Sequence, residues 1–578
     1  MRVELGKRDR RVYYLYMASI VGKRQGGKTY YYLVESARVE GKPRIVSQQY
    51  LGSAEEVTAK LAGAQAGAPV RSAHKKFGDV AAVWSVLERL GVAEAIDGVA
   101  PRRSDAAVSV GTYIALATLN RIVAPCSKAA FASWWDSTAA PRWCPLPAGS
   151  LDHRKFWSAM DRLDRDDLAR IEGALSARMV TEFGLDLTAL VLDMTNFATY
   201  IDSGNEAAPI AQRGKAKQKR VDLRLVGLAL VITSDGGIPL LSHPYPGDRP
   251  DVTQFPGVID DLVDRYRSVA AGIEGATIVY DAGQNSAANH AHIEEARIGF
   301  VGSLPPSDHP ALLTVPVEAY HRVDDPRLPG MRAYDTEVDA LGVRRRAIVT
   351  HSASLHAAQS RGFDQTLDKA RDRLGALQVR LARGRTRRDR AAVEREIEQI
   401  CAPRWVAEVL TVTLTGTTPA QLRLRYRTDR HARRQLEDRM FGKRILFTNR
   451  TDWPVARVIA AYRSQSDIES GFRQLKDPQV ISFSPMHHWT DQKIRVHVFY
   501  SVLALTIAHL MRREAADAGL HLSVRELLAE LAGIEETVLL YHDGTKGRPR
   551  AQRMLTDHSD TAEQLARLFG IDRYAPTR

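Results

Sequence analysis

Apolar residues recur at helical spacing in the part of the chain that follows residue 72. Val80, Val83, Val86, Leu87 and Leu90 lie one, three or four positions apart, a pattern typical of a helix with one buried face. Three further helices are predicted in this part, at Val108–Val123, Leu151–Leu163 and Asp167–Phe183. We therefore predict a helical region over residues 73–186.

Short apolar runs replace this pattern from Leu187 onwards and predict strands. The runs are Thr188–Leu192, Leu223–Thr233, Ile238–His243, Ala276–Tyr280 and Ile298–Val301. Asp235-Gly236-Gly237 is typical of a hairpin turn between the second and third runs. One helix, marked by Val258 and Leu262, follows the third run, and a second is predicted over Ser286–Ala296. The resulting order, β-β-β-α-β-α-β, predicts an α/β core whose first part spans residues 187–304.

Residues 305–445 interrupt this core with a different pattern. Leucines at helical spacing predict a helix over Phe363–Leu381, and Val393, Ile397 and Ile400 predict a second one. The link Arg383–Arg390 is strongly basic, and we interpret it as the tip of a helical hairpin, either solvated or in contact with nucleic acid. Strands are predicted at Val406–Leu414, Leu422–Tyr426 and Arg444–Thr448. The whole is interpreted as a mixed α/β insertion.

The second part of the core, residues 446–514, contains a predicted helix over Ala461–Asp477. On this helix one row is formed by Tyr462, Gln465, Glu469, Phe472 and Lys476. An apolar stripe beside the row is formed by Ile468, Phe472 and Leu475. The apolar run His497–Met511 is too short and too polar for a membrane span and predicts a core helix. Residues 515–578 are predicted to form a helical tail with a basic loop, Lys546–Arg553.

The amino-terminal segment, residues 1–72, is predicted to contain a β-hairpin. Its strands are Thr29–Val39 and Arg44–Leu51, joined by a turn at Glu40–Pro43. Residues 1–50 contain eleven Lys/Arg and four Asp/Glu, a difference of +7. Tyr30, Tyr31 and Tyr32 among these cations suit contact with a phosphate backbone. A surface hairpin that is basic only by composition is the alternative.

The whole chain of 578 residues is basic as well, with a net charge of +13 and a pI of about 9.6. A basic surface of this size favours an anionic partner, with nucleic acid first. The cysteines, Cys126, Cys144 and Cys401, lack metal-type spacing and are odd in number, so a reducing cytoplasm is expected. No secretory signal is evident at the amino terminus.

The strongest candidate chemistry is a set of three carboxylates, Asp193, Asp281 and Glu469. Both aspartates follow predicted apolar strands, and Glu469 lies beside the apolar stripe of its helix. If the first and fourth strands are neighbours, the two aspartates lie close together, which is unfavourable unless a cation lies between them. Three such carboxylates suit two Mg²⁺ ions and displacement at phosphorus. An ordinary amphipathic helix with a solvated Glu469 remains the alternative. His487, His488 and His497 lack partners at zinc-ligand spacing.

The sequence resembles the DDE transposases of bacterial insertion sequences, in the group with a Tyr-Arg-Glu-Lys signature. The family spacing Y-(2)-R-(3)-E-(6)-K is met by Tyr462, Gln465, Glu469 and Lys476, so that three of the four positions match. LVLDMTNF around Asp193 and IVYDAGQNS around Asp281 are similar to the first and second acid motifs. Gln465 departs from the family's arginine and lacks its charge and bidentate fork.

The resemblance implies a ribonuclease-H-like catalytic core, an insertion between the second aspartate and the glutamate, and an amino-terminal helical region that binds DNA or dimerises. It implies cleavage at the ends of the element and strand transfer into target DNA, with two Mg²⁺ per site, for which Mn²⁺ is expected to substitute. DNA-positioning residues are expected to be Tyr462, Arg463, Gln465, Arg473 and Lys476.

The expected partners are double-stranded DNA and further copies of this chain, as a homodimer or a higher synaptic assembly. A bacterial cytoplasmic location in contact with the nucleoid, and no membrane partner, are expected. Two alternatives stay open. One is a ribonuclease-H-like nuclease without strand transfer, and the other is an inactive descendant that only binds DNA.

Overall fold

The structure of the protein is a computed structural model that describes residues 17–39, 42–58, 69–202, 204–214, 222–269, 275–384, 388–541 and 550–577. It is a mixed α/β structure with several sheets. The chain forms two compact units. The first is built from the described parts of Met1–Lys75, Glu535–Thr556 and Pro576–Arg578, and the second from those of Lys76–Ile534 and Asp557–Ala575.

The first unit is built on β-structure. Strands β1 (Met17–Gln25), β2 (Lys28–Val39) and β3 (Lys42–Ser53) form one antiparallel sheet. The predicted hairpin is therefore confirmed and carries one more strand. Strand β1 was not predicted, because its apolar residues Ile20 and Val21 are adjacent in the sequence and do not alternate with polar ones. Both side chains are exposed in the structure, by 55% and 38%. The basic residues before residue 17 lie outside the described part.

A second sheet has the order β17-β16-β4, with β4 at Arg71–Lys76, β16 at Glu535–Tyr541 and β17 at Arg550–Leu555. The prediction of a wholly helical tail over residues 515–578 is wrong here. Strand β16 (EETVLLY) is rich in β-branched and long apolar residues and finds partner strands on both sides, so tertiary pairing decides its conformation. In the sequence, helix α18 (Val524–Ala532) precedes β16 and helix α19 (Asp560–Leu568) follows β17, and both belong to the second unit. Residues 546–549 of the predicted basic loop lie outside the described part.

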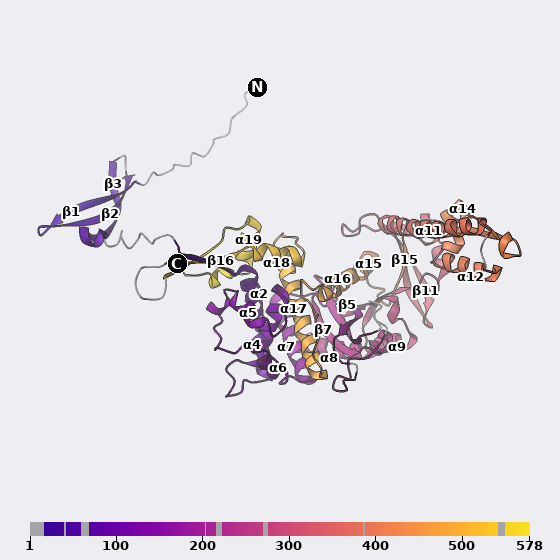
Figure 1. Ribbon diagram of the computed structural model, residues 1–578, viewed down its shortest axis with the longest axis horizontal. Helices are drawn as coiled ribbons and strands as arrows, with labels where there is room; N and C mark the ends of the chain where they lie inside the picture. The colour runs from indigo at the N-terminus through magenta and orange to yellow at the C-terminus, as the bar shows by residue number, and fades with distance from the viewer. Residues whose placement is uncertain are drawn as a thin grey trace, which may run out of the picture. The chain divides into compact units, whose positions relative to one another are not determined.

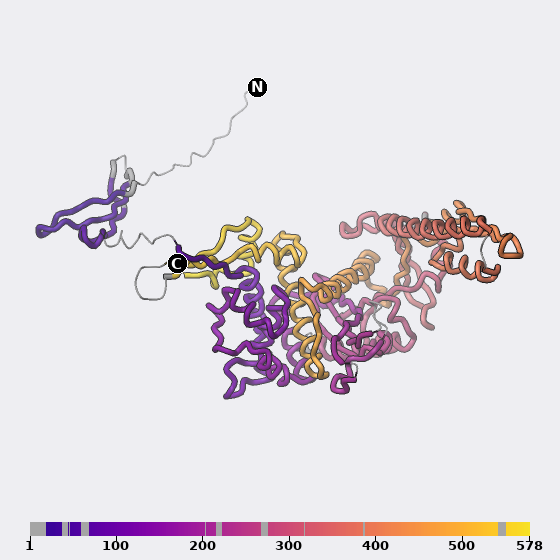
Figure 2. The backbone as a smooth tube through the Cα atoms, viewed as in Figure 1, coloured from indigo at the N-terminus to yellow at the C-terminus, as the bar shows by residue number. Residues whose placement is uncertain are grey.

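Helices from the amino-terminal region and one late helix form the helical part of the second unit. The early helices are α2 (Gly78–Arg89), α3 (Val92–Val99), α4 (Val110–Val123), α5 (Phe131–Asp136), α6 (His153–Met160) and α7 (Arg165–Phe183). Helix α17 (Asp491–Asp517) contacts α2, α4, α6 and α7, as Figure 2 shows by the yellow-orange helix beside the purple ones. The helical prediction for this region is confirmed.

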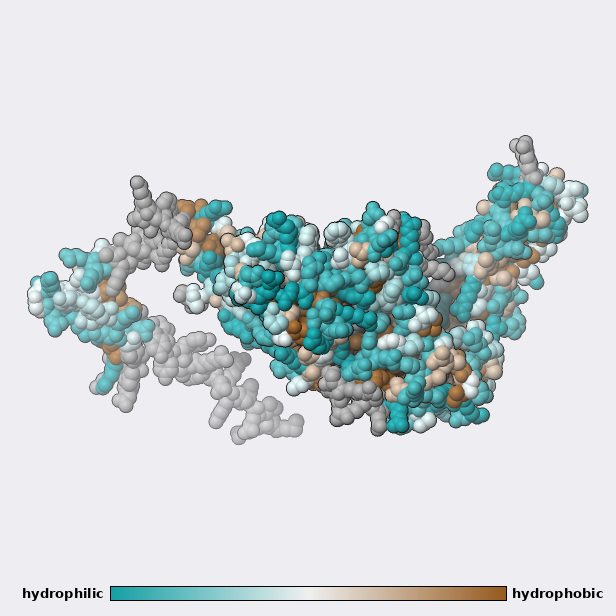
Figure 3. Space-filling model, turned by 90° about the horizontal axis from the view of Figure 1, so that it is seen from below, coloured by the Kyte–Doolittle hydropathy of each residue, from teal (hydrophilic) through white to brown (hydrophobic). Residues whose placement is uncertain are grey.

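Helix α17 is long and apolar enough to cross a membrane by length and composition alone. However, 94% of its most apolar window is buried inside the protein. The prediction of a core helix is therefore confirmed. The face of the molecule drawn in Figure 3 is mainly hydrophilic. Among the described residues, the apolar ones on this face lie in small separate patches.

A nine-stranded sheet forms the centre of the second unit, in the order β10-β11-β12-β15-β9-β8-β5-β6-β7 (Figure 1). Its first segment along the chain has the predicted order. This segment contains β5 (Ala189–Thr199), β6 (Arg224–Thr233), β7 (Pro239–Pro246), α8 (Asp251–Val269), β8 (Thr277–Val279), α9 (Ala287–Glu295) and β9 (Gly299–Leu304). Strands β5, β8 and β9 are parallel, whereas β6 and β7 are antiparallel to their neighbours. The segment Arg213–Arg220 (RGKAKQKR), between β5 and β6, is strongly basic, and its residues 215–220 lie outside the described part.

The same sheet continues into the segment predicted as an insertion. Strands β10 (His321–Arg322), β11 (Met331–Ala340), β12 (Val343–Ser352) and β15 (Lys443–Thr448) extend it beyond β9. A boundary between insertion and core at residue 445 therefore falls inside β15. Strands β11 and β12 were missed because acidic and basic residues (RAYDTEVD and VRRRAIV) hide their alternation.

The inserted body proper lies between β12 and β15 and has its own core. It contains α11 (Ala353–Ala382), α12 (Arg390–Cys401), α13 (Val406–Val409), β13 (Leu410–Thr415), β14 (Arg423–Thr428) and α14 (Arg430–Met440). The predicted helical hairpin is confirmed, and its leucines pack with residues of β14, α14 and Phe441. Residues 385–387 of the basic tip lie outside the described part. The body leaves and rejoins the sheet at one point, where the Ser352 N–H donates to the Gly442 carbonyl at 2.9 Å.

Candidate active site

Asp193 lies on strand β5, and Asp281 lies at the equivalent position just beyond the end of the neighbouring parallel strand β8. Val191 of β5 pairs with Val279 of β8, and each aspartate is two residues further along its chain. Neighbouring strands are about 4.8 Å apart, so the register brings these two carboxylates together. The condition set for this pair of carboxylates, that the first and fourth strands are neighbours, is therefore met. One detail was wrong, because β5 continues to Thr199 and Asp193 lies inside it, pairing with Leu230 of β6.

The face of β5 that carries Asp193 is covered by helix α16 (Gln465–Lys476). Side chains two residues apart on a strand share a face, so Asp193 shares its face with Thr195 and Phe197. Lys476 Nζ donates to Thr195 Oγ1 at 2.7 Å and lies 5.3 Å from the centre of the Phe197 ring. The helix of the predicted glutamate therefore packs on the aspartate face of the sheet.

Asp281 is held on the same side by hydroxyl groups. Ser303 Oγ of β9 and the Tyr462 hydroxyl donate to its Oδ1 at 2.9 Å and 3.1 Å. The N–H of Ala282 donates to this oxygen as well, at 2.8 Å. Burial raises the pKa of Tyr462, so its phenol stays protonated and is a donor at neutral pH. These contacts fix the direction of the Asp281 carboxylate.

Tyr462 belongs to a separate helix, α15 (Val455–Arg463), and not to the helix of Glu469. The chain turns at Ser464, which has φ −65° and ψ −6° and ends α15, and α16 begins at Gln465. The prediction of one continuous helix over Ala461–Asp477 is therefore wrong at this point. The apolar stripe is confirmed, because Ile468, Phe472 and Leu475 are all buried.

Glu469 is exposed and lines a cavity of about 470 Å³ between the sheet and these two helices. Tyr462, Arg463 and Gln465 line the same cavity. Its other walls come from β12, β15 and the first turns of α11, through residues such as Thr350, Arg444 and Leu355. The remaining predicted DNA contacts lie elsewhere, since Arg473 is exposed outside this cavity and Lys476 lies against β5. The cavity thus gathers three of the five predicted DNA-positioning residues with the glutamate.

The carboxylates have the oxygen donors that Mg²⁺ prefers. Two of them, Asp193 and Asp281, are brought onto one face by adjacent strands. Among the described residues, however, no group of three or more His, Cys, Asp or Glu side chains is arranged to hold a metal ion. Glu469 lies on helix α16, which packs on β5, and does not complete a three-carboxylate cluster with the two aspartates. The donor chemistry fits divalent metal, and the assembly of all three acids stays a prediction.

Of the three histidines without zinc-ligand spacing, His497 is a buried structural residue, whereas His488 is half-buried and His487 is exposed. His497 Nε2 is 2.8 Å from the Phe483 carbonyl, and its Nδ1 is 2.6 Å from the Tyr500 hydroxyl. Both ring nitrogens therefore have protein partners. Burial lowers the pKa of His488 to about 3, which keeps this ring neutral.

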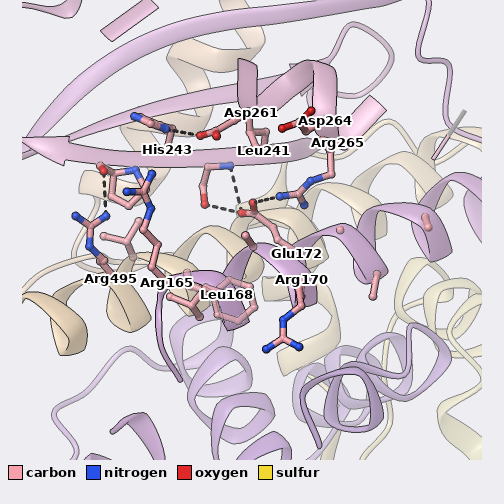
Figure 4. A pocket seen from close by; sticks show the side chains of 18 residues that line it. Arg165, Leu168, Arg170, Glu172, Leu241, His243, Asp261, Asp264, Arg265 and Arg495 are labelled. Carbon is pink, nitrogen blue, oxygen red and sulfur yellow. Dashed lines mark hydrogen bonds and ion pairs between the residues drawn. The ribbon is translucent and has the colours of Figure 1, made fainter. Parts of the chain in front are cut away.

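A cavity of about 540 Å³ lies elsewhere in the second unit, between α7, β7, α8 and α17 (Figure 4). Charged side chains line it, and four of them are paired with one another. Arg265 lies 2.9 Å from Glu172, and His243 lies 2.6 Å from Asp261. None of the predicted site residues lines this cavity. Its volume alone therefore does not make it the reaction site.

The family model for the transposase DDE domain matches residues 185–507, more than half of the chain. The chain belongs to this family. The matched region contains Asp193, Asp281 and Glu469, together with the inserted body and most of α17. The recognition of a DDE transposase from sequence motifs is thus confirmed at the level of the family.

Two other comparisons give no match or only a distant one. The search of curated proteins finds no match for this transposase. Among solved structures, it is similar to the cryo-EM structure of a piggyBac transposase synaptic complex with hairpin DNA. The TM-score is 0.36 at 8% identity, and the likeness covers 80% of this chain and 82% of the other. At these values the likeness is too distant to assign function.

Two residues near the carboxylates were missed in the sequence, Ser303 and Arg444. Ser303 follows a predicted strand, and its position beside the strand of Asp281 was the only signal that pointed to it. Arg444 begins a predicted strand, but it is one of 81 Lys/Arg residues in the chain. Only strand register shows that both lie on the carboxylate side of the sheet.

Proposed function

We propose that this transposase cleaves phosphodiester bonds at the ends of a bacterial insertion sequence and joins the freed ends to target DNA. The observation that supports this most is the matched register of Asp193 and Asp281 on parallel strands, with the Glu469 helix on the same face. Parallel β5, β8 and β9 with antiparallel β6 and β7 on one side support a ribonuclease-H-like core. The body between β12 and β15 is then the insertion of that core.

The proposed cofactor is Mg²⁺, two ions per site, with Mn²⁺ as a substitute. Asp193, Asp281 and Glu469 would hold the metal, which lowers the pKa of an attacking water or hydroxyl and stabilises the leaving oxygen. The chain's own contribution is to orient these carboxylates. Ser303 and Tyr462 fix Asp281 through their hydroxyl groups, and Lys476 anchors α16 to β5 beside Asp193.

The proposed partner is double-stranded DNA, bound by two or more copies of this chain in the bacterial cytoplasm. The net charge of +13 supports an anionic partner. The cavity residues Tyr462, Arg463 and Gln465 would position the DNA strand, and Arg473 and Lys476 would bind it further along α16. A polyanion bound over this face places its backbone next to the carboxylates.

A nicking assay on labelled DNA that carries the element's own ends tests this function. We expect nicking at the repeat boundary with Mg²⁺ and none with EDTA. Glu469→Gln, Asp193→Asn and Asp281→Asn should each lose activity by a factor of at least about 10³ while still binding the ends. Glu398→Gln changes an exposed glutamate of α12 in the same way and should retain activity.

The products separate the proposal from its alternatives. Ends joined to target DNA are expected for a transposase, whereas nicking without joined products indicates a plain nuclease. If the ends are bound but never cut under any metal condition, the proposed activity is wrong and the chain only binds DNA. If Glu469→Gln cuts as fast as the unchanged protein, Glu469 is not a metal ligand.

A further inference from the structure

Arg444 lies on the carboxylate face of the sheet. It pairs in register with Thr350 of β12. Leu446, two residues further along β15, pairs with Ser303 of β9, and Ser303 donates to Asp281. Paired residues in antiparallel strands share a face, and so do residues two apart on one strand. The alternation therefore directs the Arg444 side chain to the side of Asp281.

The guanidinium of Arg444 lies next to the tyrosine that contacts Asp281. Its central carbon is 5.7 Å from the centre of the Tyr462 ring, a distance at which an arginine is attracted to the ring. Tyr462 in turn donates to Asp281 Oδ1 at 3.1 Å. Arg444, Tyr462 and Asp281 thus form a continuous set of contacts from the cavity to the carboxylate.

No hydrogen bond or ion pair engages the Arg444 guanidinium within the part of the chain that the structure describes. The residue is exposed and lines the same cavity as Glu469, Arg463 and Gln465. Two arginines and one glutamate give these cavity residues an excess of one positive charge. Gln465 also contributes an amide nitrogen, Nε2, which is buried and has no hydrogen-bond partner among the described residues.

An arginine stacked on an aromatic ring presents its N–H donors in a fixed plane, which matches the oxygens of a phosphate. A cavity of about 470 Å³ has room for a phosphodiester group. We propose that Arg444 binds a backbone phosphate of the DNA strand in this cavity and thereby positions the strand beside Asp281. The inference rests on the proposed function, since it gives that function one of its strand-positioning residues.

Gln465 offers a second position from which a positive charge can be placed in the cavity, in place of the charge of Arg444. In a Gln465→Arg variant a guanidinium would enter the same cavity from α16. If the task of Arg444 is to supply a cation for a phosphate, a cation from position 465 should replace it in part. A purely structural role for Arg444, packing on Tyr462, gives no such rescue.

Binding of labelled end DNA in EDTA, measured over a range of salt concentrations, tests the inference without cleavage. We expect Arg444→Ala to bind roughly tenfold more weakly at low salt and to lower the slope of log K against log salt by about 0.9, the contribution of one phosphate. Arg444→Lys should keep the slope but bind more weakly, because it lacks the fork. The double variant Arg444→Ala with Gln465→Arg should regain the slope.

The control is Arg425→Ala, which removes an exposed arginine of β14 in the inserted body and should leave the slope unchanged. Equal affinity and slope for Arg444→Ala and the unchanged protein would overturn the inference. A lowered melting temperature with an unchanged slope in Arg444→Ala would overturn it as well, because it would assign Arg444 a purely structural role. If the unchanged protein binds no end DNA, the proposed function fails first, so the two failures are distinguishable.

Discussion

The Tyr462 hydroxyl donates to Asp281 Oδ1 at 3.1 Å, which joins helix α15 to the end of strand β8. The aspartate therefore receives one hydroxyl from a helix and a second from Ser303 of the neighbouring strand. Two elements far apart in the sequence thus hold one carboxylate in a fixed direction. Partners of this kind set the orientation of a metal-binding carboxylate and are costly to lose.

Tyr462→Phe removes one of these donors and keeps the ring. We expect the fold to persist and the Mg²⁺ concentration for half-maximal nicking to rise roughly tenfold. The measurement is the nicking rate against Mg²⁺ concentration. Tyr541→Phe, which removes the hydroxyl that donates to Gln552 at 3.2 Å in the first unit, serves as the control. An unchanged Mg²⁺ dependence in Tyr462→Phe would show that this hydrogen bond does not orient a ligand.

Glycine at position 302 allows β9 and β15 to approach. A Cβ at Gly302 would lie 2.6 Å from the Phe447 ring and 3.2 Å from the Tyr280 ring. Gly302→Ala should therefore cost about 1–3 kcal/mol of unfolding free energy. Gly283→Ala is the matched control, because its Cβ would meet nothing within 4 Å. Thermal unfolding of both variants measures the difference, and equal melting temperatures would contradict this packing.

The apolar stripe of α16 holds the Glu469 helix on the sheet. Leu475 is fully buried at 0% exposure, and Leu475→Ala should cost about 2–5 kcal/mol. Arg473→Ala changes an exposed position of the same helix and should cost about 0.5 kcal/mol or less. Thermal or urea unfolding gives the comparison. Similar losses in the two variants would mean that α16 is not packed through this stripe.

Acid should destabilise the second unit through its buried histidines. Burial lowers the pKa of His509 to about 3, so its ring is neutral in the folded protein. In the unfolded chain the His509 ring takes up a proton below about pH 6.5. The contribution of the neutral ring to the free energy of unfolding is therefore fully present above that pH. It is lost as the pH falls toward 3, by about 1.4 kcal/mol per pH unit.

Urea unfolding between pH 7 and pH 5 measures this effect. His509→Gln should show a shallower fall in stability with decreasing pH than the unchanged protein, even if it is less stable at pH 7. His521→Gln, at an exposed position, provides the comparison. A parallel fall in all three proteins would assign the acid sensitivity to other groups.

Much of the core could be predicted because its elements have regular patterns. The order of strands and helices from Leu187 to Leu304 follows from short apolar runs and one amphipathic helix, and the two aspartates follow from where those runs end. The break at Ser464 could not be predicted, since residues on both sides of it continue the helical spacing. Strands β11 and β12 were not predicted either, because charged residues occupy their alternating positions. Their conformation is determined by pairing with each other and with β15.

The contacts of the site were less accessible than its acids. Residue type and spacing indicate Asp193, Asp281 and Glu469, but nothing in one sequence reveals which face of β15 carries Arg444. That face is determined by register with β9 and β12, over sequence separations of more than 90 residues. Residues with local signals were therefore found, and residues placed by distant pairing were not.

The inserted body joins the sheet where the Ser352 N–H meets the Gly442 carbonyl, at the end of the paired strands β12 and β15. In evolutionary terms it occupies the place of a hairpin turn. A short turn between these strands would keep the same register, so the body can lengthen, shrink or change without shifting Asp193 against Asp281. Its first helical turns also form a wall of the Glu469 cavity, so diversification there reshapes this proposed DNA site while the register of the two aspartates stays the same.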